Sequence, residues 1–513
     1  MIYTILIKNG LVVDGTGKPP YQADVGILGK RIRDIGKLGD QGDVIIDATN
    51  HYVAPGFIDL TSHSDTYGTL FAAPLQDSLL MQGVTTIVIG NCGYSLAPLA
   101  SGAPLDNLGR WITTAPFNIN WSSVAEFYGS LKQLGVGVNV ATLVGHETLK
   151  QSSATLDEQL LLLTRSFEEG AWGLSSNFSF TNLATKTKEE TQELLKVVAH
   201  YKGLYKVHLG DEGQNLLPEL AEVLSLVRAS GVRTTISHLK AIGRKAWRDL
   251  KKALLMIERA RQEGLDITFD MFPYLRTGSM LLSFLPMWAR EGDNAAIMER
   301  LTNPETSQFI IKDLERMTLH PDRILIASAQ QQKTHVGKTL ERITQDLGCG
   351  REVAILELLK ANHLAVTVFG KTLRSTNIID GFPQPGAMVA SDGAGYDLSF
   401  LSSHDLAHPR SFGAFARFFG VIAPRMNMNP ETAIYKMTSA PAKALGLRDR
   451  GTLVEDAIAD VAIFLPETFR DRATYRMPYQ YAEGMAFTIV GGEIAVQQGS
   501  LEQARFGIPL VHS

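Results

Sequence analysis

The sequence predicts an α/β protein built on a TIM-type (β/α)8 barrel, with a small β-sandwich formed by both termini. In the middle of the chain, short apolar segments alternate with amphipathic helical segments, which is the pattern of βα units around a parallel sheet. Both ends of the chain instead carry short strands separated by Gly-containing turns, as in antiparallel β-structure. With 513 residues, the chain is long enough for a large domain and a smaller one.

The two ends of the chain have the same pattern of short strands and turns. Residues 1–56 contain "TILIKNGLVV", "ADVGIL", "RIRDIG" and "DVIIDA", and residues 441–513 contain "ADVAIFL" and "AFTIVGGEIAVQQGS". We predict that residues 1–56 and 441–513 together form the β-sandwich. Two unrelated β-appendages are the alternative.

Residues 57–440 are predicted to form the barrel. Its strand candidates are, in chain order, "YVAPGFIDL", "TTIVIGN", "NVATLVG", "WGLSS", "YKVHL", "RTTISHL", "DITFDMFPY" and "AMVASD". Segments such as "DEQLLLLTRSFEEG" between them have helical periodicity. The interval between the seventh and eighth strands is too long for a simple connection, so residues 280–385 are predicted to be an inserted lid.

Composition excludes several classes of protein. A formal net charge of -4 and the lack of a basic run give no electrostatic basis for binding nucleic acid. Two cysteines in so long a chain exclude a disulfide scaffold. The sequence has no apolar run long enough to cross a membrane and no signal peptide pattern. We therefore expect a cytoplasmic protein that acts on a small molecule; its oligomeric state is not predicted.

Residues able to bind a metal follow six of the predicted strands. They are His63, Cys92, His146, His208, His238 and Asp392. Because the C-terminal ends of barrel strands meet at one mouth, these side chains are expected to converge. Cys92, His208 and His238 supply the thiolate and imidazoles of a three-ligand zinc site with one position open for water. Asp392 is then placed to move a proton.

The chain resembles the D-aminoacylase (N-acyl-D-amino-acid deacylase) family of the amidohydrolase superfamily. The resemblance covers nearly the whole sequence and is carried by "APGFID", "GVTTIVIGNCGYSLAP", "GLSSN", "MVASDG" and "HPRSFGAFARFFG". It implies one tightly held zinc ion on the cysteine and the two histidines named above. It also implies that Arg410 pairs with the substrate α-carboxylate, that Lys240 lies near the substrate side chain, and that Ser279 contacts substrate.

The stretch "APGFIDLTSHSD" departs from the family pattern, which has a histidine where Thr61 stands. That histidine and His63 would form a weak second metal position, so we expect Thr61 to impair it and leave one ion. His63 would then orient Asp392 or the attacking water, and Thr61→His would restore the second position. Phe272 replaces a tyrosine and Gly210 an arginine of the family pattern, which bears on substrate choice.

The predicted activity is zinc-dependent hydrolysis of N-acyl-D-amino acids to a carboxylic acid and a free D-amino acid. One alternative is a hydantoinase-like hydrolase of cyclic amides, although "GLSSN" offers no lysine for carbamylation. The other is a catalytically impaired barrel with a binding role.

Overall fold

The computed structural model describes residues 2–99, 119–177, 188–503 and 505–512, and at its centre is the predicted barrel. All eight predicted segments contain barrel strands, the third in two parts. The strands are β6 (Phe57–Asp59), β7 (Val84–Ile89), β8 (Asn139–Thr142) with β9 (Val144–Gly145), β10 (Gly173–Asn177), β11 (Leu204–His208), β12 (Thr234–Ile236), β13 (Ile267–Met271) and β17 (Ala387–Val389). Their ladders are parallel, and a parallel bridge between Ser62 and Gly393 joins the last strand to the first.

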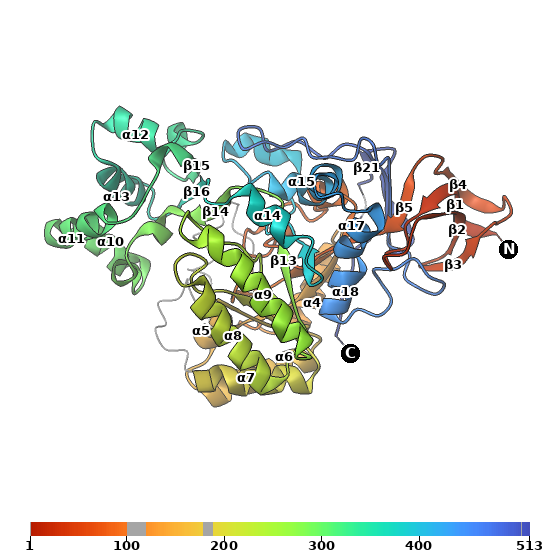
Figure 1. Ribbon diagram of the computed structural model, residues 1–513, viewed down its shortest axis with the longest axis horizontal. Helices are drawn as coiled ribbons and strands as arrows, with labels where there is room; N and C mark the ends of the chain where they lie inside the picture. Colours follow the sequence, from red (N-terminus) through yellow and green to blue (C-terminus); the bar gives the residue numbers. More distant parts are fainter. Residues whose placement is uncertain (1, 100–118, 178–187, 504, 513) are drawn as a thin grey trace.

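Amphipathic helices connect these strands and cover the barrel (Figure 1). They include α4 (Val124–Leu134), α6 (Leu156–Glu168), α7 (Lys188–His200), α8 (Leu216–Ser230), α9 (Asp249–Gln262), α14 (Ser375–Gly381) and α17 (Pro430–Met437). Capping boxes begin two of them, because Ser123 and Thr155 each accept a hydrogen bond from the main chain three residues later, at a glutamate. The buried faces of these helices and the outward faces of the strands share one large apolar core.

Both termini contribute to one nine-stranded sheet, as the sequence predicts. Its strands are β1 (Tyr3–Val12), β2 (Tyr21–Leu28), β3 (Arg31–Gly36), β4 (Gly42–Asp47), β5 (Tyr52–Pro55), β18 (Val461–Phe464), β19 (Met485–Val490), β20 (Glu493–Gln497) and β21 (Ser500–Leu501). The C-terminal strands join the N-terminal ones where β18 pairs with β5. The segment "YVAPGFIDL" therefore divides: β5 belongs to this sheet, and β6 begins the barrel.

Asp460 ties the small sheet to the barrel. Its carboxylate pairs with the buried Arg450, accepts a hydrogen bond from Asn139 at the start of β8 (3.1 Å), and accepts another from the main chain of Gly491 (2.7 Å). The chain then returns to the barrel near its C-terminus, where the main-chain N–H of Leu510 donates to the Val140 carbonyl at 2.8 Å.

The long interval after β13 forms a separate layer of structure at the opposite end of the molecule from the N-terminal sheet (Figure 1). Strands β14 (Thr277–Met280), β16 (Val366–Gly370) and β15 (Ile324–Ala329) pair antiparallel in that order. Helices α10 (Asn294–Thr302), α11 (Pro304–Glu315), α12 (Leu340–Leu347) and α13 (Arg351–Ala361) enclose a second apolar core with them. The domain boundaries given above, including 280–385 for the lid, stay a prediction.

In the part of the chain that the structure describes, no helix has the length and apolar character needed to cross a membrane.

Candidate metal centre and active site

The predicted ligands lie where barrel strands end. His208 is the last residue of β11, His238 follows β12, and Cys92 follows β7. The main chain at Cys92 and His238 is left-handed, with φ of 55° and 36°. Residues other than glycine adopt this conformation at an energetic cost that surrounding structure must offset, and such residues cluster at functional sites. The two turns therefore aim a thiol and an imidazole at a common point.

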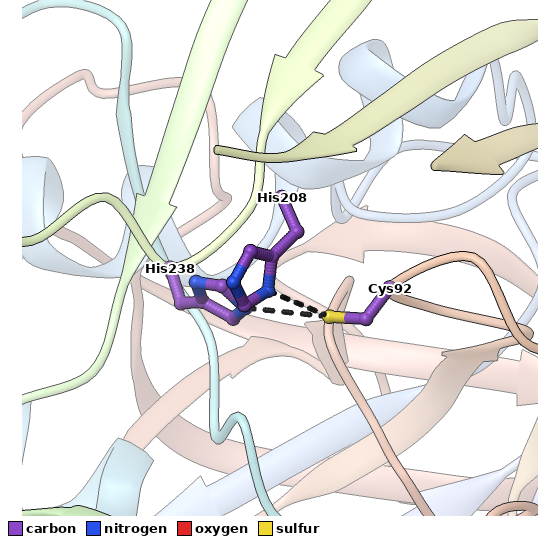
Figure 2. A group of neighbouring side chains, drawn as sticks. All are labelled: Cys92, His208 and His238. Carbon is purple, nitrogen blue, oxygen red and sulfur yellow. Dashed lines mark hydrogen bonds between the residues drawn. The ribbon is translucent and has the colours of Figure 1, made fainter. Parts of the chain in front are cut away.

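The three side chains meet as Figure 2 shows, with the sulfur facing both rings. Cys92 Sγ lies 3.4 Å from His208 Nδ1 and 3.3 Å from His238 Nε2. In a tetrahedral zinc site, a sulfur at about 2.3 Å and a nitrogen at about 2.0 Å from the ion are roughly 3.5 Å apart. The three ligand atoms all lie within 4.8 Å of one another. The spacing and the chemistry of this donor set therefore fit zinc.

The thiol of Cys92 is set up to ionise. Burial alone would raise its pKa, but the neighbouring imidazoles of His238 and His208 hold that pKa well below its usual range. The thiolate is the form that binds metal. The local electrostatics therefore suit Cys92 to bind a metal ion.

Behind His238 lies a pair of charges that the sequence did not predict in this arrangement. Glu212 Oε1 is 3.3 Å from His238 Nδ1 and 2.5 Å from Lys240 Nζ. Lys240 Nζ also lies 2.8 Å from the same ring nitrogen. Carboxylates in this position fix the ring and the tautomer of a metal-binding histidine. Lys240 is thus already paired with a carboxylate beside the metal centre, although it also lines the cavity described below.

Asp392 lies on the other side of His238. Its Oδ1 is 4.0 Å from His238 Nε2 and 3.1 Å from His63 Nε2, and its Oδ2 pairs with the buried Arg410. Burial raises the pKa of Asp392, but Arg410, His238 and His63 hold it well below its usual range. The group is therefore a carboxylate at neutral pH, which is the form that accepts a proton.

A cavity of about 470 Å³ opens over these groups, between the barrel mouth and the inserted segment. The predicted site residues that line it are His63, Cys92, His208, His238, Asp392, Arg410, Lys240 and Ser279. Ser279 comes from β14 of the inserted segment, opposite the strand ends. Phe272 is buried, and its ring supports the Arg410 guanidinium, whose carbon lies 5.0 Å from the ring centroid.

Two of the residues considered above lie apart from this cluster. His146 is fully buried at the start of α5 (His146–Ser152) and is not in the one three-ligand group found among the described residues. Thr61 is also fully buried, and its hydroxyl donates to Asp270 at 2.8 Å.

Sequence reasoning missed Arg290. This arginine follows the predicted lid's "FLPMW" segment, lines the cavity, and is half-buried. Its Nε is buried without a hydrogen-bond partner, and no carboxylate of the described residues pairs with it. Burial lowers its pKa with no acidic group to oppose the effect. Nothing in the local sequence marks it, since its position over the mouth depends on how the insert folds back.

Comparisons with known proteins identify the family and the fold. An amidohydrolase family model matches residues 378–496. The chain is 30% identical to the N-acyl-D-glutamate deacylase of Alcaligenes xylosoxydans xylosoxydans, over 95% of this chain and 92% of the relative. The N-acyl-D-glutamate deacylase of Bordetella bronchiseptica, solved with zinc and a phosphonate mimic of the tetrahedral intermediate, superposes with a TM-score of 0.84 at 27% identity over 100% of both chains.

Two further structures bear on the metal and on the hydantoinase alternative. A D-aminoacylase matches with a TM-score of 0.82 and 27% identity over 98% of this chain and 99% of that one, and its study describes a binuclear centre with one-metal activation and second-metal attenuation. The L-hydantoinase of Arthrobacter aurescens reaches a TM-score of 0.61 at 14% identity, over 99% of this chain and 100% of that one, and shares the fold alone. The near-full-length identity, the barrel and the Cys–His–His centre lead to one conclusion: the chain belongs to the D-aminoacylase (N-acyl-D-amino-acid deacylase) family of the amidohydrolases.

Proposed function

We propose that this chain is a metal-dependent amidohydrolase that cleaves N-acyl-D-amino acids to a carboxylic acid and a free D-amino acid. The observation that carries the proposal is the cluster of Cys92, His208 and His238 at the floor of the cavity, with the Asp392 carboxylate 4.0 Å from His238. These three side chains would hold one zinc ion. A zinc ion there would polarise the scissile carbonyl and lower the pKa of a water molecule towards about 7.

Asp392 is the proposed proton carrier. As a carboxylate it takes a proton from the attacking water while the water oxygen bonds to the carbonyl carbon. When the C–N bond breaks, the same side chain returns that proton to the leaving nitrogen, so the amine departs neutral. His63, at 3.1 Å, orients Asp392 for both transfers.

Arg410 is proposed to bind the α-carboxylate. Its guanidinium is almost fully buried and lines the cavity. One of its nitrogens pairs with Asp392, and its Nε has no hydrogen-bond partner among the described residues. The planar group offers five N–H donors, so one edge can donate to Asp392 while the others donate to a substrate carboxylate. This arrangement would fix the substrate relative to the proton carrier.

The substrate side chain is proposed to be acidic. Ser279 and Lys240 both line the cavity, but Lys240 already lies 2.5 Å from Glu212. Arg290 has no such partner among the residues that the structure describes. Its main chain is fixed because Arg300 donates to the carbonyls of Ala289 (3.4 Å) and Glu291 (2.5 Å). An uncompensated guanidinium on a fixed loop favours a second carboxylate.

The centre is proposed to hold one tightly bound ion, with Thr61 impairing a second position. Cytoplasmic location and action on a small molecule stay proposals as well.

The test is a screen of N-acetyl-D- and N-acetyl-L-amino acids, read by released amine, on protein of measured zinc content. We expect D-selective release that falls on chelation and returns with zinc. A protein that holds one zinc per chain but releases amine from no substrate would instead support the binding role.

A further inference from the structure

A fully buried lysine lies inside the barrel, next to the proposed metal centre. Lys206 precedes His208 by two residues on β11, so both side chains point into the barrel, and that of Lys206 lies one layer further from the mouth. Lys206 has no exposed surface. Buried lysines are rare unless other groups compensate the charge.

Two groups from other parts of the barrel surround the Lys206 ammonium: one from β13 and one that follows β6. Its Nζ lies 2.5 Å from Asp270 Oδ2 and 2.7 Å from Thr61 Oγ1. The Thr61 hydroxyl in turn donates to the same Asp270 oxygen at 2.8 Å. The three polar atoms close a triangle, so the hydroxyl and the carboxylate together satisfy a charge that has no access to water.

This triangle is joined to the metal centre through Asp270. The other carboxylate oxygen of Asp270 accepts the main-chain N–H of His238 at 2.6 Å, and the Asp270 carbonyl accepts that of Leu239 at 2.8 Å. These bonds hold the left-handed turn that presents the His238 ring. Lys206 therefore neutralises the carboxylate that positions a metal ligand.

Thr61 stands where the family pattern has the histidine of the second metal position. An imidazole at this position would extend beyond the threonine hydroxyl, towards the space that the Lys206 ammonium now fills at 2.7 Å. A divalent ion nearby would also face a positive charge across a buried region, where bulk solvent screens charges less. We propose that Lys206 is a resident cation that takes the place of a second metal ion and holds the centre at one ion.

The inference rests on the proposed Cys92–His208–His238 centre and has two consequences. First, excess zinc should not add a second ion, whereas the study of the related D-aminoacylase describes second-metal attenuation. Second, Thr61→His is not enough to restore a second position, because the ammonium remains. Lys206 must be replaced as well.

Metal binding, measured apart from activity, tests both consequences. Wild type, Thr61→His, Lys206→Thr and the double variant are dialysed against rising zinc, and metal per chain is determined by mass spectrometry. We expect one ion in the first three proteins. The double variant should take a second ion about 10- to 100-fold more tightly than Thr61→His does, the usual range of coupling between two sites.

The controls separate this inference from the proposed function. Thermal unfolding shows which variants are folded, and a wild-type cobalt titration, followed by the thiolate-to-cobalt absorption band, gives the stoichiometry even if the double variant fails to fold. A wild type that binds no ion overturns the metal centre itself. A wild type that binds two ions, or Thr61→His binding the second as tightly as the double variant, overturns the role of Lys206.

Discussion

Arg290→Met removes the one cavity-lining arginine or lysine that has no carboxylate partner among the described residues, while roughly preserving the length of the side chain. The other two, Arg410 and Lys240, each pair with a carboxylate and should be little affected. If Arg290 binds the acidic side chain of the substrate, its loss should weaken recognition of that side chain alone.

The expected loss of binding free energy in Arg290→Met follows from how deeply Arg290 is buried. Truncating one partner of a buried, hydrogen-bonded charge pair costs about 2–5 kcal/mol. Arg290 is only half-buried, so solvent screening favours the lower end of that range. A loss of about 2 kcal/mol in transition-state binding corresponds to roughly a 30-fold fall in kcat/KM.

The assay compares two substrates of nearly the same shape, N-acetyl-D-glutamate and N-acetyl-D-glutamine, in wild type and Arg290→Met. Wild type should favour the glutamate substrate, with an advantage that shrinks as ionic strength rises. The variant should lose that advantage and retain its activity towards the glutamine substrate. Arg316→Met is the matched control, since Arg316 is exposed in the same insert and does not line the cavity.

The two substrates also discriminate between explanations. An equal loss on both would show that Arg290 binds the α-carboxylate, which the two substrates share. No loss on either would show that Arg290 does not contact substrate. Either result would refute the proposed preference for acidic side chains.

Four further predictions concern the metal centre and the fold. Cys92→Ala should abolish both zinc retention and turnover, measured on dialysed protein, since the site has one thiolate; stoichiometric zinc in the variant would contradict this. Asp392→Asn should keep zinc but lower kcat by about 10²–10⁴-fold, the usual contribution of a general acid–base; an unchanged kcat would remove Asp392 from proton transfer. Glu212→Gln should lower zinc affinity by roughly 10–100-fold in a chelator competition, because the carboxylate orients His238; unchanged affinity would show that the contact is incidental. Asp460→Ala should cost about 3–5 kcal/mol in urea unfolding, because it leaves Arg450 buried without its partner, and a cost below 1 kcal/mol would contradict this reasoning.

The sequence by itself determined the barrel and the convergence of the three proposed metal ligands. Apolar strands alternate with amphipathic helices, so the strand order and the parallel sheet follow from local patterns. In such a barrel the strand ends meet at one mouth, which is why Cys92, His208, His238 and Asp392 were predictable without coordinates. The sequence also placed His146 among the converging side chains, but His146 is not in the three-ligand group of the described residues. A histidine that follows a strand looks the same in the sequence whether or not it reaches the metal site.

Only the tertiary structure decided which charges compensate one another. Lys206 meets Thr61 across 145 residues of chain, and Thr61 meets Asp270 across 209. Lys240 is paired with Glu212, whereas the way the insert folds over the mouth leaves Arg290 with no carboxylate partner among the described residues. Such pairings leave no periodic signal in the sequence, because a side chain's electrostatic environment is set by whatever packs against it in space. The proposed metal site is thus built at strand ends, while the proposed substrate preference and number of ions rest on contacts between distant segments.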